Sequence, residues 1–267
     1  MRRIASAVAA AAALLLGAGT ARADPLRDLC LDRPGLGTPA CTIDPGHAMV
    51  ELGLGDWTLT RQGGAREDDL ATGDLLVRYG LTSSLEVQVG WTAYAHIRTR
   101  SGNGVARAGG AGDVTVAVRQ NLHHPDGSGF SAAIMPYATL PTGSDGIGAG
   151  DWGAGVLVPM SYELPHGFAL DLTAEADAAV DADGNGRHFA YSAIFGLDMK
   201  LTDKVGATAE LEAARDEDPS GHSTQLLAGL SAAWTPSDNL QLDLGTNLGL
   251  NRDAPDLEVY FGVARRF

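Results

Sequence analysis

Carboxylates on one side of an extended chain are the most chemically suggestive feature of this sequence. In residues 167–180, GFALDLTAEADAAV, Asp171, Glu175 and Asp177 alternate with alanine and leucine. Successive side chains of a β-strand point to opposite faces, whereas helical spacing would scatter the charges around a cylinder. The pattern therefore predicts strands with one acidic face, and rings of Asp and Glu around a pore attract cations.

The same parity, applied along the chain, yields a candidate set of inward-facing residues. It comprises the acidic residues Glu86, Asp113, Asp171, Glu175, Asp177, Asp198, Glu210, Glu212, Asp243 and Glu258 and the bases Arg78, Arg119 and Lys200, with Arg98 and Arg266 as further inward bases. Most of the bases fall near one end of their strands, which leaves the middle acidic. We predict a cation-preferring lumen in which Glu175 and Glu210 share a constriction.

Residues for nucleophilic catalysis are scattered. Acyl hydrolysis needs a nucleophile, a base and an orienting group brought together. The sequence has no G-x-S-x-G motif, and most of its seven histidines fall at predicted loops, turns or strand ends: His47, His96, His123, His124, His166, His188 and His222. We predict no catalytic residue and no enzyme, with an outer-membrane hydrolase as an open alternative because barrel enzymes need no local motif.

Metal-binding patterns are incomplete. The loop 181–186, DADGNG, has the opening spacing of a calcium loop, but Ser192 stands where the bidentate Glu is expected. The adjacent His123 and His124 would point opposite ways in an extended chain. The sequence favours a solvated hairpin loop at 181–186 and predicts neither a metal site nor a cofactor, although a cation bracing this loop stays open.

The two cysteines, Cys30 and Cys41, lie early in the chain on either side of LDRPGLGTPA. In an oxidising compartment such a pair forms a disulfide, which would close a small loop ahead of the first strand. A metal site with His47 as third ligand is the alternative, but the spacing matches no zinc pattern. We predict the disulfide.

Charge excludes one class of partner. The chain has 19 Lys and Arg against 33 Asp and Glu, a net charge of -14. Removing Arg2, Arg3 and Arg22 with a leader makes it -14 - 3 = -17. Such acidity argues against nucleic acid as a partner.

The elements that position these residues follow an N-terminal leader. Residues 1–23 combine a basic start, an apolar run and an Ala21-Arg22-Ala23 ending, which predicts a cleaved signal peptide and a mature protein from Asp24. No later apolar run is long enough for a membrane helix, so membrane residence would require a barrel. We expect residues 24–46 to form a periplasmic N-terminal segment and residues 47–267 a transmembrane β-barrel.

Period-two segments recur from residue 47 to the end and predict an all-β, up-and-down antiparallel barrel. Short turns alternate with longer Gly- and Asp-rich links, and an even strand number puts both barrel ends on the periplasmic, short-turn side. The twelve predicted strands span residues 47–60, 70–79, 84–98, 112–122, 129–140, 151–163, 167–180, 188–201, 204–215, 222–234, 239–250 and 256–267.

Aromatic residues support a membrane barrel over a soluble sandwich. The rings that fall next to short turns, each with its strand's apolar parity, are Tyr79, Phe130, Tyr162, Phe168, Trp234 and Phe267. Barrels carry such aromatic girdles at the membrane interfaces. The last strand, DLEVYFGVARRF, looks like a C-terminal signal for the outer-membrane assembly machinery, with Phe267 as its terminal aromatic and Arg265 as a departure from the pattern.

Three internal motifs sharpen the match: YGLTSSLEVQVG from Tyr79, GGAGDVTVAVRQNL from Gly109 and YATLPTGSDGIGAGDWGAGV from Tyr137. With the barrel pattern they resemble the family of outer-membrane barrels assigned to transport and to the phenol meta-cleavage pathway, over about Met49 to Phe267. The resemblance implies a Gram-negative outer-membrane channel or transporter in contact with lipid and lipopolysaccharide.

The predicted function is passage of small solutes, with hydrophobic or aromatic compounds among the candidates. A structural or adhesion barrel with a closed lumen stays open. At this strand number the lumen lies between side-chain-filled small barrels and open porins. Whether residues 24–46 enter it as a plug is a question for the structure.

Overall fold

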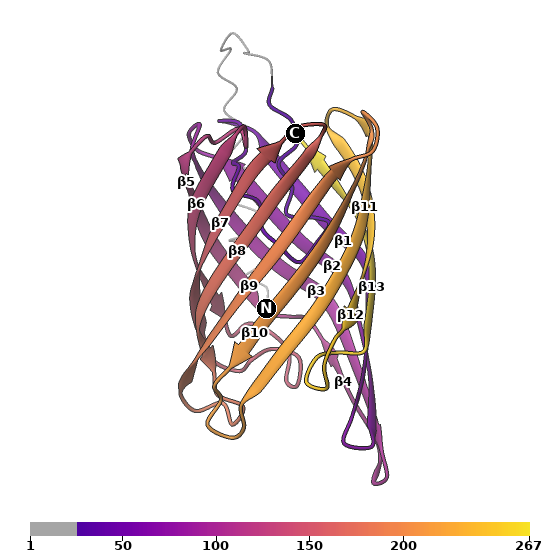
Figure 1. Cartoon of the computed structure of the whole chain (residues 1–267). Coiled ribbons are helices and arrows are strands. Elements are labelled where there is room, and N and C mark those ends of the chain that lie inside the picture. The colour runs from indigo at the N-terminus through magenta and orange to yellow at the C-terminus, as the bar shows by residue number, and fades with distance from the viewer. Residues whose placement is uncertain (1–25) are drawn as a thin grey trace.

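A computed structural model describes residues 26–267. The predicted signal peptide, residues 1–23, and Asp24 lie outside the described residues. The chain forms one closed barrel of antiparallel strands that are tilted relative to the barrel axis (Figure 1). The strands are β1 (Ala48–Gln62), β2 (Ala65–Gly80), β3 (Leu85–Ser101), β4 (Gly104–Gly110), β5 (Val114–His123), β6 (Phe130–Leu140), β7 (Gly153–Leu164), β8 (Phe168–Val180), β9 (Arg187–Lys200), β10 (Val205–Asp216), β11 (Ser223–Ser237), β12 (Leu240–Gly249) and β13 (Leu257–Arg266).

The barrel closes between its first and last strands. β1 pairs with β13 from Met49 opposite Arg266 to Leu59 opposite Leu257. Apart from β4, which pairs only with β3, each strand is thereby paired on both sides. A membrane-spanning sheet requires this because lipid cannot satisfy free amides and carbonyls.

The barrel wall is twelve strands wide, although residues 26–267 form thirteen strands. β4 and β5 both pair with β3, β4 along its outer half and β5 along Leu85–Trp91. β4 and β5 therefore occupy one strand position of the wall, with an interruption at residues 111–113. The predicted loop 99–111 is wrong in this respect, since most of it is a β3–β4 hairpin that projects beyond the wall (Figure 1).

The ends of the barrel differ as the turn pattern predicts. One end carries short connections such as 81–84 and 201–204, and we call it the turn end. The other, the loop end, carries longer links, including 141–152 and 217–222. Between β1 and β2 the predicted link 61–69 shortens to Gly63-Gly64, because both glycines adopt positive φ and allow a tight hairpin.

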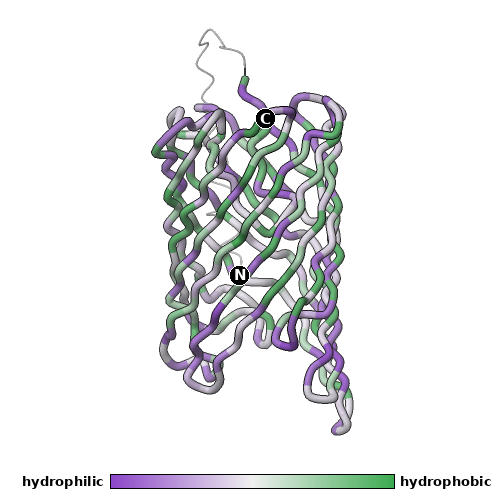
Figure 2. The backbone as a smooth tube through the Cα atoms, viewed as in Figure 1, coloured by the Kyte–Doolittle hydropathy of each residue, from purple (hydrophilic) through white to green (hydrophobic). Residues whose placement is uncertain are grey.

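The outer face is apolar. Large side chains stand exposed on it, including Phe195 and Leu244, 62% and 63% accessible. Hydrophobic and polar residues alternate along the strands in Figure 2. Of the predicted girdle, the rings at least 42% exposed are Phe130, Tyr162, Phe168, Trp234 and Phe267. Exposed apolar surface on this scale marks contact with lipid or protein.

No helix in residues 26–267 is long and apolar enough to cross a membrane.

Candidate functional site

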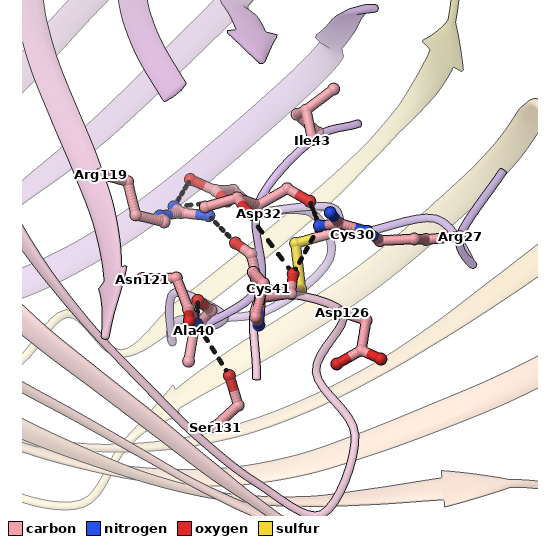
Figure 3. The surroundings of a disulfide bond; sticks show 12 residues. Arg27, Cys30, Asp32, Ala40, Cys41, Ile43, Arg119, Asn121, Asp126 and Ser131 are labelled. Carbon is pink, nitrogen blue, oxygen red and sulfur yellow. Dashed lines mark hydrogen bonds and ion pairs between the residues drawn. A yellow bond between two sulfur atoms is a disulfide. The ribbon is translucent and has the colours of Figure 1, made fainter. Parts of the chain in front are cut away.

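The N-terminal residues 26–46, here called the luminal segment, fold into the barrel from its turn end (Figure 1). The sequence predicts a periplasmic segment here and leaves open whether it enters the lumen. In the structure it enters the lumen, where carboxylates and guanidinium groups of the inner wall bind its backbone. The predicted disulfide is confirmed: Cys30 and Cys41 are bonded and close the segment into a finger (Figure 3).

A buried ionic cluster anchors the base of the finger to β1–β3. Arg78 is fully buried and its Nη1 lies 3.1 Å from Glu51 Oε1, while its Nη2 lies 2.9 Å from Glu86 Oε1. The same guanidinium donates a 2.7 Å hydrogen bond to the Cys30 carbonyl. In return, Glu86 accepts the Ile43 amide at 2.7 Å. Breaking such a network by removing one partner is costly, since an uncompensated charge stays buried.

Arg119 of β5 extends this anchor. Its Nη2 lies 2.8 Å from both carboxylate oxygens of Asp32, a residue of the finger, and its Nη1 donates to the Cys41 carbonyl at 3.2 Å (Figure 3). Asn121, two residues along on the same face, donates to the Ala40 carbonyl at 2.8 Å. Side chains of the wall thus hydrogen-bond to backbone carbonyls of the finger at both cysteines of the disulfide.

The tip of the finger crosses the lumen to the opposite wall. Both oxygens of Glu210 on β10 accept backbone amides, from Leu36 and Gly37, at 2.8 Å each. Thr173 of β8 exchanges hydrogen bonds with the amide and carbonyl of Thr38. Gly35 turns the tip with a φ of +126°, and a Cβ there would lie 2.8 Å from Glu210 Oε2.

Side contacts hold the finger between anchor and tip. Arg33 Nη2 lies 3.0 Å from Asp243 Oδ1 on β12, and the Arg33 carbonyl accepts a 2.9 Å hydrogen bond from Gln241. Nearer the rim, Arg266 of β13 donates to the Arg27 carbonyl at 2.6 Å. The segment therefore has hydrogen-bond or ion-pair partners on β1–β3, β5, β8, β10, β12 and β13.

A cavity of about 1230 Å³ remains between the finger and the β8–β12 wall. Turn residues such as Thr202 and Asn239 line its outer part, and Asp171, Asp198 and Glu210 line its depth. The cavity therefore extends from the turn end to the residue that holds the finger's tip.

Beyond the tip, towards the loop end, the inward face is acidic. Tyr137 donates to Glu175 Oε1 at 2.6 Å and also contacts Asp177. Glu212 lies within electrostatic reach of Glu175 and Glu258. Among the ion pairs of residues 26–267, no Lys or Arg lies within 4.0 Å of these four carboxylates.

The acidic layer is accessible. Glu175, Asp177, Glu212 and Glu258 are half-buried, in contrast with the fully buried Glu51 and Glu86 beneath the finger. The loop-side half of the lumen is thus lined by partly exposed acidic side chains, and we call it the acidic compartment.

Most of the predicted pore-lining residues fall into two groups. Glu86, Arg78, Arg119, Asp243 and Glu210 bind the luminal segment. Asp171, Asp198, Glu175, Asp177, Glu212 and Glu258 face the cavity or the acidic compartment.

Two predicted pore residues do other things. Lys200 is exposed at a turn and lies 3.2 Å from Asp203. Asp113 sits in the β4–β5 interruption and accepts amides of Gly143 and Ala149, which pins the loop 141–152.

Sequence reasoning missed several partners. Glu51 lies on the polar parity of VELGLG and could have been found by the same rule. Tyr137 lies on the inward parity of β6, but nothing local marks it as a carboxylate partner. Asp32 belongs to the finger, where no strand pattern applies.

Histidines show no catalytic arrangement in the described part of the chain. The ring nitrogens that form hydrogen bonds there meet backbone carbonyls or Asp181, and none meets a serine or threonine hydroxyl. The rings of His123 and His124 lie 4.1 Å apart at a tilt of 47°. The expectation that they point opposite ways is wrong, because His124 adopts a positive φ of 51° and leaves the extended conformation. At the loop end, Asp181, His188 and Asp218 come together in a group able to hold a metal ion.

Sequence comparison then places the chain. The family described as "Putative MetA-pathway of phenol degradation" matches residues 31–267. The protein belongs to this family. The match begins within the finger and includes all thirteen strands. No curated protein matches the chain in sequence.

Solved structures confirm the fold. The β domain of the Bordetella autotransporter BrkA matches with a TM-score of 0.53 and 12% identity, covering 83% of this chain and 98% of that chain. The translocator domain of NalP from Neisseria meningitidis matches with 0.51 and 17%, covering 89% and 91%. The KdgM porin in complex with disordered oligogalacturonate matches with 0.51 and 10%, covering 83% and 99%. At these identities the likeness shows the outer-membrane barrel fold alone.

Proposed function

We propose that this barrel passes small solutes across the outer membrane and that the luminal segment is its plug. The observation that carries the proposal is the position of the finger's tip. It lies between the turn-side cavity and the acidic compartment and is held there by Glu210 and Thr173. Two water-accessible spaces separated by one short loop are what a gated channel needs.

Cations are the favoured solutes. The acidic compartment carries Glu175, Asp177, Glu212 and Glu258 without a paired Lys or Arg among the described residues. Such a ring attracts cations and repels anions at close range. The family's description further supports aromatic compounds as candidate solutes, and KdgM, of like fold, is named a porin.

A closed structural barrel is the second candidate, because the anchor around Arg78 and Arg119 seals the β1–β5 side of the lumen. In such a barrel the finger would stay in the lumen permanently. No bound cofactor or covalent chemistry is part of either proposal.

Single-channel recording in a planar bilayer separates the two. The full mature chain should show small or infrequent openings, and a variant without residues 24–46 should show large, sustained ones. Both proteins must first migrate differently on gels before and after boiling, as closed barrels do. No conductance from either folded protein would reject the channel and favour the structural barrel.

A further inference from the structure

A cluster at the loop end joins the two links that flank the β9–β10 hairpin. Asp181 lies at the start of the β8–β9 link, His188 at the start of β9, and Asp218 in the β10–β11 link. One potential ligand atom from each lies within 4.8 Å of the other two. Their side chains are 15%, 6% and 11% exposed, so these groups converge in a largely buried place.

The spacing suits a tetrahedral ion. His188 Nδ1 lies 3.0 Å from Asp181 Oδ1 and 3.5 Å from Asp218 Oδ2. Ligands at about 2.0–2.1 Å from a tetrahedral zinc ion lie about 3.3–3.4 Å from each other. The two measured distances bracket this edge, so small side-chain shifts would admit an ion between the three atoms.

The other imidazole nitrogen supplies an independent sign. The His188 side chain is only 6% exposed. Its Nε2 lies 3.1 Å from Asp216 Oδ1 but makes no aligned hydrogen bond. A carboxylate facing the second nitrogen is the usual way in which a metal-binding histidine is oriented. A bound ion at Nδ1 would place the proton on Nε2, towards Asp216.

The charge of the surroundings favours a cation. Asp181 and Asp218 face the imidazole in a largely buried place, and Asp216, 43% exposed, lies on its other side. The nearby Arg187 and Arg215 pair with Asp151 and Glu217 instead. A divalent ion would neutralise two carboxylates.

Asp218 is prepared to act as a ligand. The Ser220 hydroxyl and the Ser220 amide both donate hydrogen bonds to Asp218 Oδ1. The Ala182 amide reaches Asp218 Oδ2 at 2.7 Å, which fixes the orientation of the oxygen that faces His188.

We propose that Asp181, His188 and Asp218 bind one divalent transition-metal ion of the zinc class and so tie the β8–β9 link to the β10–β11 link. An imidazole ligand and only two carboxylates favour zinc over calcium, which takes six to eight oxygens. The calcium-like spacing in residues 181–186 thus contributes Asp181 alone. Water would complete a four-coordinate site.

Direct binding tests the proposal. The full-length mature protein, without a histidine tag, is refolded in detergent, stripped with EDTA and titrated with Zn²⁺ by calorimetry. We expect one site per chain, weakened at least about tenfold by His188→Ala and by Asp218→Asn. The control His222→Ala removes an exposed histidine of the same link, which lies 2.9 Å from Glu217, and should bind as the wild type does.

Two further readouts keep the outcome clear if one variant folds poorly. Co²⁺ in place of Zn²⁺ should give the intense visible absorption of tetrahedral coordination through the wild type and not through Asp181→Asn. Zn²⁺ should also slow protease cleavage at residues 181–187 and 217–222, whereas Ca²⁺ should not. Absence of binding by the folded wild type, or equal binding by His188→Ala and wild type, would overturn the site.

Discussion

The Gly37 amide donates a 2.8 Å hydrogen bond to Glu210 Oε1, although the two residues are 173 positions apart. The second oxygen of the same carboxylate holds the Leu36 amide at 2.8 Å. One wall residue thus takes both backbone amides at the tip of the finger. This contact lies where the two water-accessible parts of the lumen would otherwise meet.

Removing the acceptor should loosen the tip. In Glu210→Ala the Leu36 and Gly37 amides lose both oxygens, while the anchor around Arg78 stays intact. We expect more frequent or larger openings in planar-bilayer recordings. Glu212→Ala is the control for opening frequency, since it removes a carboxylate from the same strand without touching the finger. It should open no more often than the wild type, and its effect should fall on ion selectivity. Identical traces from wild type and Glu210→Ala would show that the tip is not the barrier.

Gly35→Ala should disturb the same tip from the other side. The φ of +126° is unfavourable for alanine, and its Cβ would approach Glu210 Oε2 to 2.8 Å. Strain of this kind costs about 1–3 kcal/mol. We expect faster proteinase K cleavage within the luminal segment, followed by mass spectrometry. Gly102→Ala, with no neighbour within 4 Å of its added Cβ, should be cleaved as the wild type is.

The disulfide should hold the finger closed. Cys30 and Cys41 are 11 residues apart, and a loop of that size gains about 2–3 kcal/mol from the bond in the chain-entropy account. Both thiols should resist alkylation unless reduced first. The double variant Cys30→Ser with Cys41→Ser should expose the segment to protease while the barrel still shifts on gels. Ready alkylation of the unreduced wild type would contradict the expectation.

Ion selectivity should follow the acidic compartment. Glu175→Gln with Glu212→Gln removes two charges without touching the contacts of the finger, which makes this pair a cleaner test than one that includes Glu210. We expect a cation-selective reversal potential in the wild type that shrinks in the double variant. Salt should weaken it too, because the screening length is about 10 Å at 0.1 M.

Lys200→Gln is the control for selectivity, since Lys200 is an exposed rim residue paired with Asp203. Its reversal potential should stay close to that of the wild type. Anion selectivity in the wild type would show that the rim bases, and not the inner carboxylates, control permeation.

Assembly should depend on the last residue. Phe267 is 62% exposed on the outer face, and its backbone exchanges hydrogen bonds with Ala48 at the barrel's closing seam. Deleting it removes both the terminal aromatic and a seam contact, so we expect less protein in the outer-membrane fraction. Phe267→Tyr keeps both features and should restore the level. Undiminished protein after the deletion would mean that the terminal ring is dispensable for assembly.

The period-two alternation by itself determined the barrel. Each strand must turn an apolar face to lipid and a polar face inward, so parity in a segment such as 167–180 already assigns Asp171, Glu175 and Asp177 to one side. The disulfide was also predictable from the sequence, because Cys30 and Cys41 are close in the chain and their pairing closes only a short loop. The β3–β4 hairpin escaped because its residues 99–111, rich in glycine, arginine and alanine, lack a strong alternation.

Only the tertiary structure decided what the inward residues bind. The finger has no strand pattern, and its partners, from Glu51 to Gln241, come from walls that meet only after the barrel closes. The same holds for Asp181, His188 and Asp218, because the whole β9–β10 hairpin separates the link of Asp181 from that of Asp218. Side-chain parity is a local property of the backbone, whereas the partner of a buried charge depends on contacts between distant parts of the chain.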